Sequence, residues 1–315
     1  MARKRKIYLL CPWHKTGGPE DIHQLCHAIN TRGGHDFEAL IVYYQAGPGF
    51  ADLPADGVLY TGEGYYDSAE IRRAAIIEDH PGNVVVLPEV LPLESLQGIG
   101  SCLKVIWWLS LAFGLRWKDA HLEACREGSW MAFHARHAWS EIVPAVADLG
   151  ASGRCLMLSD YIRKAFWRFP WDPGHKRDLV VYNANRDRGT GLLCARMGIP
   201  ALGLCGLDQK GVMAALAGAK VYVDLGFHPG KDHLPREAAI LGCVVITNRQ
   251  GCAVNSEDLP IAEKCANDME VLVRIGEGFT DYHGAYARQS DYHAMLRGEQ
   301  SVFLEQVREF LDRLT

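Results

Sequence analysis

The chain has 315 residues, of which 48% are hydrophobic and 23% are charged, and its formal net charge is −5. This length accommodates two domains of ordinary size, and the balance of apolar and charged residues excludes a disordered chain. The negative charge provides no general attraction for nucleic acid, although a local basic patch would be enough for binding. The ten cysteines form no C-x-x-C pair and most lie in apolar runs. This usage favours buried thiols in a reducing compartment and argues against a zinc site.

Two apolar runs are candidates for a targeting or membrane segment. The chain opens with MARKRK, but the apolar run Ile7–Cys11 that follows is too short for the core of a signal peptide. The run Val105–Leu115 is too short to span a bilayer. We therefore expect a cytoplasmic protein without a transmembrane segment.

The first half alternates predicted strands and helices, which is typical of a parallel sheet covered by helices. Strand Lys6–Cys11 leads through a loop with Gly17–Gly18 into the amphipathic helix Glu20–Thr31, and strand Phe37–Tyr44 follows. This opening has the order of a Rossmann fold but lacks G-x-G-x-x-G, so it does not predict NAD binding. Further strands are predicted at Val58–Tyr60, Asn83–Pro88, Lys104–Leu109, Trp130–His134 and Cys155–Leu158, and further helices at Ser68–Asp79, Leu93–Ser101, Trp139–Leu149 and Asp160–Phe169.

A second alternating half follows the Pro- and Gly-rich segment Phe169–Lys176, which we interpret as a linker. This half begins with strand Asp178–Tyr182 and the polar loop Asn183–Gly191. Val221–Asn248 then has the pattern of a strand, a loop, a helix and a strand, which predicts a right-handed parallel crossover with its loop at the carboxyl end of the first strand. The other elements predicted are helix Leu192–Met197, strand Pro200–Cys205, helix Lys210–Ala217 and a C-terminal helix Ser301–Leu314.

The loop Gly226–Pro235 and the helix after it carry groups that suit a nucleotide sugar. A helix N-terminus with unpaired N–H groups attracts phosphate, and Lys231 and Arg236 add positive charges beside it. Glu237 follows, where a carboxylate is placed to accept hydrogen bonds from the ribose hydroxyls. The alternative interpretation of the same residues is a solvated ion-pair cluster that caps the helix.

The candidate residues of the first half lie at the predicted ends of strands. Gly17–Gly18 either lets backbone amides approach a phosphate or an acceptor, or forms only a turn. Glu89 either positions or deprotonates an acceptor hydroxyl, or only opens the next helix. His134, with His137 as its competitor, is a candidate for bonding a hydroxyl of the donor sugar. His23 lies inside a helix, where a lone histidine is more often a partner of the core.

Aromatic residues give two further hypotheses. Trp107 and Trp108 are neighbours on a predicted strand and face opposite sides, so we expect one in the core and the other free to stack on a sugar or a base. The segment Tyr161–Arg177 interleaves basic and aromatic residues. Such a mixture is typical of a nucleic-acid groove, and also of a helix surface beside a linker.

Two Rossmann-like halves, a Gly-Gly loop after the first strand and a Glu-bearing helix before G-C-V-V-I-T resemble a GT-B glycosyltransferase. The nearer match is the group with a retaining-type Glu-Ala C-terminal signature. In that group the N-terminal loop has two glycines followed by an acid and a histidine, which TGGPEDIHQL supplies with Gly17, Gly18, Glu20 and His23.

The second acid of the C-terminal signature corresponds to Glu237 in REAAILGCVVIT. The first acid falls on Pro229, so Asp232 or His228 is the candidate replacement. The cations that hold the diphosphate in this group follow the first strand of the C-terminal half. In the loop YNANRDRGTG the matching candidates are Arg186 and Arg188.

The resemblance implies an α/β protein of GT-B type, with two Rossmann-like domains facing a cleft. Residues 1–170 would bind the acceptor, with helix 301–314 packing back on them, and residues 171–300 would bind the donor. The donor would be a nucleoside-diphosphate sugar, UDP-linked, with its base near Gly206–Lys210. The absence of a D-x-D triplet favours a metal-independent hexosyltransferase without a further cofactor. The candidate donor-binding residues are Gly17, Gly18, Arg186, Arg188, Gly206, Lys231, Arg236 and Glu237, and the candidate catalytic residues are Glu89, His134 and Asp232.

The identity of the acceptor stays open between two classes. A saccharide or another small hydroxyl compound is favoured by the overall charge of −5, because DNA binding depends on neutralising phosphates. A hydroxymethylated base in DNA, as in phages, is favoured by the basic and aromatic run Tyr161–Arg177. A sugar-nucleotide epimerase or a non-catalytic nucleotide-sugar binder of the same fold is the remaining alternative.

Overall fold

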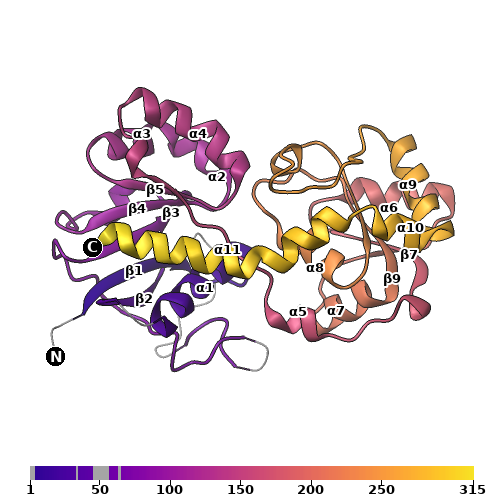
Figure 1. The fold of residues 1–315 in the computed structure, drawn as a ribbon, viewed down its shortest axis with the longest axis horizontal. Coiled ribbons are helices and arrows are strands. Elements are labelled where there is room, and N and C mark those ends of the chain that lie inside the picture. Colours follow the sequence, from indigo (N-terminus) through magenta and orange to yellow (C-terminus); the bar gives the residue numbers. More distant parts are fainter. Residues whose placement is uncertain (1–3, 33–34, 45–56, 63–64) are drawn as a thin grey trace. The chain divides into compact units, whose positions relative to one another are not determined.

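The computed structural model describes residues 4–32, 35–44, 57–62 and 65–315. The chain divides into two compact units (Figure 1): unit 1 consists of Met1–Asp160 and Ser301–Thr315, and unit 2 of Tyr161–Gln300. The sequence places the boundary at residue 171, whereas the structure places it at Tyr161. The reason is that Ile162 and Phe166 already pack into the hydrophobic core of unit 2.

Unit 1 is built on a parallel sheet of six strands in the order β2-β1-β3-β4-β5-β6. The chain runs outward from β1 to β2 on one side and from β1 through β3 on the other, so the strand order reverses between β1 and β3. Ligands bind outside the carboxyl ends of the strands at such a reversal. The strands are β1 (Arg5–Pro12), β2 (Phe37–Tyr44), β3 (Val84–Pro88), β4 (Leu103–Trp108), β5 (Trp130–Phe133) and β6 (Cys155–Met157).

The central strands of unit 1 are apolar along their length because helices cover both faces of a parallel sheet. All five residues of β3 are buried, and both Trp107 and Trp108 of β4 are at most 1% exposed. The prediction that one of these tryptophans stacks on a ligand is therefore wrong. The helices of unit 1 are α1 (Gly17–Thr31), α2 (Leu111–Gly114), α3 (Lys118–Arg126) and α4 (Arg136–Asp148), with 3-10 turns at Leu93–Leu96, Leu115–Trp117 and Ser152–Arg154.

One predicted helix and one predicted strand of unit 1 are absent from the structure at the described residues. Val58–Tyr60 forms no strand, and Ser68–Asp79 forms no helix. Part of the latter segment instead lies along the outer edge of β2, where the Ile41 N–H donates to the Arg72 carbonyl and the Ile41 carbonyl accepts from Ala74 N–H. This arrangement covers an edge that would otherwise leave backbone groups unpaired.

The predicted helix Leu93–Ser101 shortens to the single turn Leu93–Leu96. The chain leaves that turn because the Asp79 carboxylate accepts hydrogen bonds from the backbone N–H groups of Gly100, Ser101 and Cys102. A side chain that binds successive amides offers the backbone an alternative to the helix.

Unit 2 is built on a parallel sheet of four strands in the order β10-β9-β7-β8. Its strand order reverses between β7 and β9, and the loops after these two strands meet at that reversal. The strands are β7 (Arg177–Tyr182), β8 (Ala201–Gly203), β9 (Ala219–Asp224) and β10 (Val244–Thr247). The helices are α5 (Lys164–Arg168), α6 (Arg188–Met197), α7 (Gln209–Gly218), α8 (His233–Ile240), α9 (Asp268–Thr280) and α10 (Tyr282–Ala287), with 3-10 turns at Pro173–His175 and Cys252–Val254. Two parallel α/β sheets confirm the predicted fold class.

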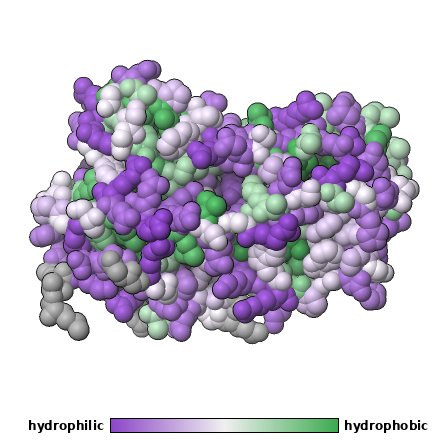
Figure 2. Space-filling model, in the orientation of Figure 1, coloured by the Kyte–Doolittle hydropathy of each residue, from purple (hydrophilic) through white to green (hydrophobic). Residues whose placement is uncertain are grey.

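The last helix, α11 (Ser290–Leu314), begins in unit 2 and ends in unit 1. Within unit 1 it is bound by side chains from three places in the chain: Arg5 donates to the Leu314 carbonyl, Arg32 to the Leu304 carbonyl, and Ser159 to the Gln306 side chain. None of the described helices is long and apolar enough to cross a membrane. On the face that Figure 2 shows, hydrophobic residues form small separate patches among polar ones.

Candidate functional site

The strand reversal of unit 2 brings together the loops that carry most of the predicted donor-binding residues. The loop after β7 carries Arg186, and the loop after β9 carries Lys231 and Asp232. Asp187 ties these loops to each other, because its carboxylate accepts from Leu225 N–H at 2.9 Å and also caps α6 through Thr190 N–H. The two loops therefore form one rigid edge at the position where open α/β sheets bind ligands.

A chain of three charged side chains crosses this edge. The Arg186 guanidinium contacts both carboxylate oxygens of Asp232, at 2.9 and 3.1 Å. The oxygen Oδ2 of Asp232, which lies 3.1 Å from Arg186, also lies 2.9 Å from Nδ1 of His228. Asp224, at the end of β9, lies farther away, with its Oδ1 3.9 Å from Nε2 of His228, and accepts from the Tyr222 hydroxyl at 3.0 Å.

The pKa values of this cluster follow from its contacts. Burial lowers the pKa of His228, but the hydrogen bond to Asp232 and the charges of Asp224 and Asp232 raise it more, so the net pKa lies above 6.5. For Asp232, burial raises the pKa, while the hydrogen bond with His228 and the charge of Arg186 lower it to below its ordinary value. Burial raises the pKa of Asp224. The imidazolium form of His228 is therefore favoured by its surroundings.

The cations expected at the diphosphate are held by carboxylates in the structure. Lys231 Nζ lies 2.6 Å from Oε1 of Glu299, a residue of α11 within unit 2. Arg236 is 1% exposed, and its guanidinium contacts both oxygens of Glu299 at 3.2 Å and donates to the Lys231 carbonyl. Arg236 is thus a buried support that joins α8 to α11. Glu299 lies far along the sequence, so the sequence offers no signal for this pairing.

The other predicted donor-binding residues occupy three different settings. Helix α8 begins at His233, so Glu237 lies in its second turn, and this residue is 8% exposed. Gly206 is exposed with φ +68°, and a Cβ there would meet no atom within 4 Å. The backbone of Arg188 opens α6, while its side chain lies outside the described part of the structure.

The predicted residues of unit 1 lie at the carboxyl edge of its sheet, as the strand ends predict. Gly17 and Gly18 form the first turn of α1 rather than a preceding loop, and Thr16 makes no side-chain cap there. A Cβ on Gly18 would stand 3.4 Å from the Leu109 side chain, in the loop after β4. The opening amides of α1 suit an anion or a hydroxyl oxygen.

Glu89 follows β3 and is 2% exposed. Its two oxygens accept from the backbone N–H groups of Leu109 and Ser110, both at 3.0 Å. Burial raises its pKa from 4.5 to about 8, against the opposing effect of these hydrogen bonds. The side chain therefore holds the loop after β4, a role that the sequence did not predict.

His134 follows β5 and lies between two carboxylates that the sequence analysis missed. Its Nε2 is 3.0 Å from Oδ1 of Asp160, which follows β6, and 3.5 Å from Oδ2 of Asp21, in α1. All three side chains are buried, and their ligand atoms lie within 4.8 Å of one another. A histidine with two carboxylates is a donor set that suits a divalent cation. The only sequence signals were the acids in GGPED and LSD.

Two other predictions concern histidine and the basic run. His23 is fully buried, bonds the Pro19 carbonyl and the Tyr43 hydroxyl, and has its pKa lowered to about 4 by burial. It is a core partner, as predicted.

In the run Tyr161–Arg177, Lys176 is buried and donates to three backbone carbonyls, so this cation is not part of a nucleic-acid groove.

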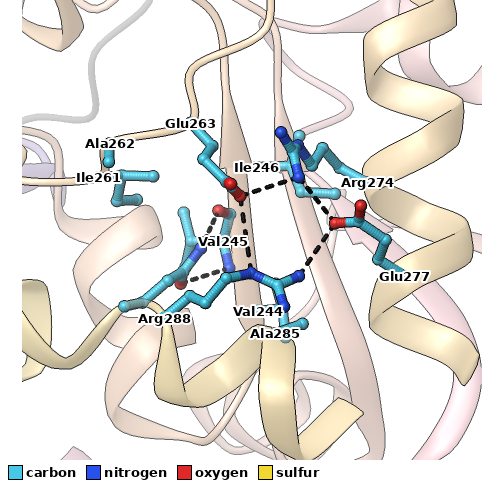
Figure 3. A pocket seen from close by; sticks show the side chains of 11 residues that line it. Val244, Val245, Ile246, Ile261, Ala262, Glu263, Arg274, Glu277, Ala285 and Arg288 are labelled. Atoms are coloured by element: carbon cyan, nitrogen blue, oxygen red, sulfur yellow. Dashed lines mark hydrogen bonds and ion pairs between the residues drawn. The ribbon is translucent and has the colours of Figure 1, made fainter. Parts of the chain in front are cut away.

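A pocket of about 200 Å³ lies against β10 in unit 2 and contains none of the predicted residues. Figure 3 shows that its charged side chains point toward one another: Arg274 and Arg288 both pair with Glu263 and Glu277. The Gln289 side chain also occupies both backbone groups of Val245. Because the charges and the strand edge are already paired, this pocket is a stabilised corner of the fold rather than a reactive site.

No protein-family model matches the chain, and no curated protein matches it. Solved structures do resemble it in fold. Sucrose-phosphate synthase from Thermosynechococcus elongatus matches with a TM-score of 0.67 and 11% identity, over 99% of each chain. HepE of Anabaena, solved with UDP and glucose, matches with a TM-score of 0.66 and 11% identity, over 98% of this chain and all of that one. Trehalose-6-phosphate synthase OtsA matches with a TM-score of 0.64 and 10% identity, over 99% of each chain.

These neighbours are glycosyltransferases of the GT-B fold, and the likeness extends over nearly the whole chain. At identities of 10 to 11% it establishes the fold of this protein. The chain therefore has the GT-B architecture that the two half-chain patterns predict.

Proposed function

We propose that the protein is a glycosyltransferase that moves a sugar from a nucleoside-diphosphate sugar to a hydroxyl acceptor. The observation that carries the proposal is the pair of carboxyl-edge sites, one at the strand reversal of each unit, on a GT-B fold. Neighbours of this fold were solved with UDP and glucose or with UDP-2-fluoro glucose, which supports a UDP-linked donor here. Fold alone does not assign an activity, so the argument rests on the residues at these edges.

We assign the donor to unit 2. Its diphosphate would lie at the N-terminal amides of α8 beside Arg186 and Lys231, its ribose at Glu237, and its base near Gly206. In the reaction, the bond between the anomeric carbon and the phosphate oxygen breaks and a bond to the acceptor oxygen forms. The acceptor hydroxyl loses its proton, and the nucleoside diphosphate leaves. No metal or further cofactor enters this scheme, because protein cations and helix amides neutralise the leaving group.

We assign the acceptor to unit 1, at the edge formed by the α1 amides, Glu89 and His134. A saccharide fits this edge better than a DNA base. The basic and aromatic run Tyr161–Arg177 was the main argument for DNA, and the structure places Lys176 of that run in the interior. We expect the protein to act in the cytoplasm, where the saccharide it modifies would be an intermediate in the synthesis of a surface glycan.

The decisive experiment is calorimetry with a panel of nucleotide sugars, each compared with its nucleoside diphosphate. We expect a UDP-sugar to bind, and Glu237→Ala to weaken binding by about tenfold through the loss of hydrogen bonds to ribose. The matched control is Glu305→Ala, which removes an exposed glutamate of α11. The absence of binding by every nucleotide and nucleotide sugar would overturn the proposal.

Turnover separates the proposal from its alternatives. Incubating the donor alone should produce no isomerised sugar, which a sugar-nucleotide epimerase would form. Adding a mixture of saccharides should release the nucleoside diphosphate. Duplex DNA should bind weakly. A steep loss of DNA affinity with salt, removed by reversing the charges of Arg163, Lys164 and Arg168, would favour the DNA acceptor instead.

A further inference from the structure

His228 is held by its backbone as well as by its side chain. Its carbonyl accepts from Cys252 N–H at 2.8 Å, and it forms a bridge with Gly251 in the loop after β10. Gly251 has φ +58°, and a Cβ there would stand 2.0 Å from the His228 carbonyl oxygen. Only glycine lets the two segments approach this closely. The position of the imidazole ring is therefore determined by the fold on two sides.

Only one nitrogen of this ring has a hydrogen-bond partner. Nδ1 contacts Asp232, and Asp232 is in turn held by both terminal nitrogens of Arg186. Nε2 is buried and has no hydrogen-bond partner, and Oδ1 of Asp224 lies 3.9 Å from it. That distance is beyond a hydrogen bond but close enough for charge attraction. The fold therefore favours the charged ring and leaves Nε2 without a hydrogen-bond partner.

A buried charged donor without an acceptor is costly, and functional sites are where such groups persist. A pocket of about 20 Å³ opens beside the ring, lined among others by Lys231, Arg236 and Tyr292. A single water or ligand oxygen needs at least about 10 to 15 Å³, so the pocket admits one oxygen atom. An acceptor oxygen from a ligand would complete the hydrogen bonding of His228.

The charge around this position indicates which ligand is suitable. The guanidinium of Arg186 is paired with Asp232, and the ammonium of Lys231 is paired with Glu299. His228 differs from these two cations in having a buried ring nitrogen, Nε2, without a hydrogen-bond partner among the described residues. It lies four residues before Asp232, the N-cap of α8, whose first amides also favour an anion.

We propose that Nε2 of His228 donates a hydrogen bond to a phosphate oxygen of the nucleoside diphosphate. The inference rests on the proposed function and names a diphosphate-binding residue within the same site. It adds a histidine to the diphosphate contacts that the proposed function assigns to Arg186, Lys231 and the α8 amides. Asp232 and Asp224 are then positioning residues, because they orient the ring and keep it charged without touching the ligand themselves.

The experiment compares wild type with His228→Gln by calorimetry, using UDP, ADP and GDP, the matching nucleosides, and inorganic pyrophosphate. We expect the variant to weaken nucleoside-diphosphate binding by roughly tenfold to a hundredfold and to leave nucleoside binding unchanged. The control, His283→Gln, removes an exposed histidine of unit 2 and should bind as the wild type does.

The pH dependence gives a second readout. The groups that face His228 are Asp224 at the end of β9, Asp232 at the start of α8, Arg186 after β7, and Lys231, Arg236, Cys252, Asp258 and Tyr292 around the pocket. The charged ring is the binding form, so affinity should fall as the pH rises through the folded-state pKa of His228, above 6.5. The Gln variant should lose this dependence. Two buffers of different ionisation enthalpy would report the linked proton.

The outcomes separate the two proposals. If UDP binds and the variant binds it equally well, the His228 assignment is overturned while the proposed function stands. If only the complete UDP-sugar is affected, His228 contacts the sugar, and the phosphate assignment is wrong. If no nucleotide binds to wild type, both proposals fail. Should the variant not fold, nitrogen-15 NMR of wild type decides the matter, because the Nε2 signal of a buried histidine must shift when UDP is added.

Discussion

Replacing Glu89 with Gln tests how strongly the interior of unit 1 opposes a buried charge. Burial raises the pKa of this carboxyl from 4.5 to about 8. In the unfolded chain the group ionises near pH 4.5, so between these pH values the folded state holds one more proton. Stability therefore falls as the pH rises through this window. Each pKa unit corresponds to about 1.36 kcal/mol, so the ionised form costs roughly 5 kcal/mol above pH 8 and about 3 kcal/mol at pH 7.

Glu89→Gln stays neutral at every pH and keeps one oxygen for the amides of Leu109 and Ser110. We expect wild type and variant to differ by no more than about 1 kcal/mol at pH 5, where both side chains are neutral. At pH 8 we expect the variant to be more stable by about 4 kcal/mol. Urea unfolding followed by tryptophan fluorescence measures this difference between pH 5 and 9, because six of the eight tryptophans lie in unit 1.

The exposed Glu141 of α4 provides the matched control, because Glu141→Gln should follow wild type across this range. Two parallel stability curves for wild type and Glu89→Gln would refute the reasoning. They would show that the two amide hydrogen bonds outweigh burial and keep Glu89 ionised. A Glu89→Gln variant that loses transfer activity but gains stability would identify Glu89 as a reacting group whose ionised carboxylate destabilises the fold.

Two further substitutions test the backbone and a buried cation. Gly251→Ala places a Cβ 2.0 Å from the carbonyl of His228, whereas Gly206→Ala, at a similar φ of +68°, meets no atom within 4 Å. We expect Gly206→Ala to lower the free energy of unfolding by about 1 to 3 kcal/mol through backbone strain, and Gly251→Ala to lower it clearly more. Equal melting temperatures of the two variants would contradict this expectation. Lys176→Met should cost about 3 kcal/mol, because three buried carbonyls lose their donor, while Lys220→Met removes a partly exposed ion pair and should cost less than about 1 kcal/mol. Similar losses in urea titrations of the two lysine variants would show that the three carbonyls find other partners.

The strands were predictable because buried parallel strands are short apolar runs bounded by turn residues. Phe37–Tyr44 was predicted with the limits that the structure gives. The structure of Ser68–Asp79 was not predictable, because its residues favour a helix. The sequence gives no sign that their backbone groups form hydrogen bonds with the edge of β2 instead. The prediction for the two tryptophans of β4 failed for a related reason. Alternation along a strand predicts that they face opposite sides of the sheet, but it does not predict that helices cover both sides.

The candidate site was predictable by position and not by pairing. Strand ends correctly placed Glu89 and His134 at the edge of one sheet. The pairing of Arg186 with Asp232, and of Lys231 with Glu299, joins segments that are far apart in the sequence. Whether a cation is available to a ligand depends on whether a carboxylate is paired with it, and a single sequence does not reveal these pairings.

The division of helix α11 between the units has a consequence for synthesis on the ribosome. Unit 2 is complete once Gln300 has emerged, because it is one continuous segment. Unit 1 is not complete until its last turn is made, since Arg5 binds the carbonyl of Leu314 and Arg32 that of Leu304. The half that is translated first should therefore be the last to finish folding, and its six-stranded sheet must wait, incompletely covered, for the end of the chain.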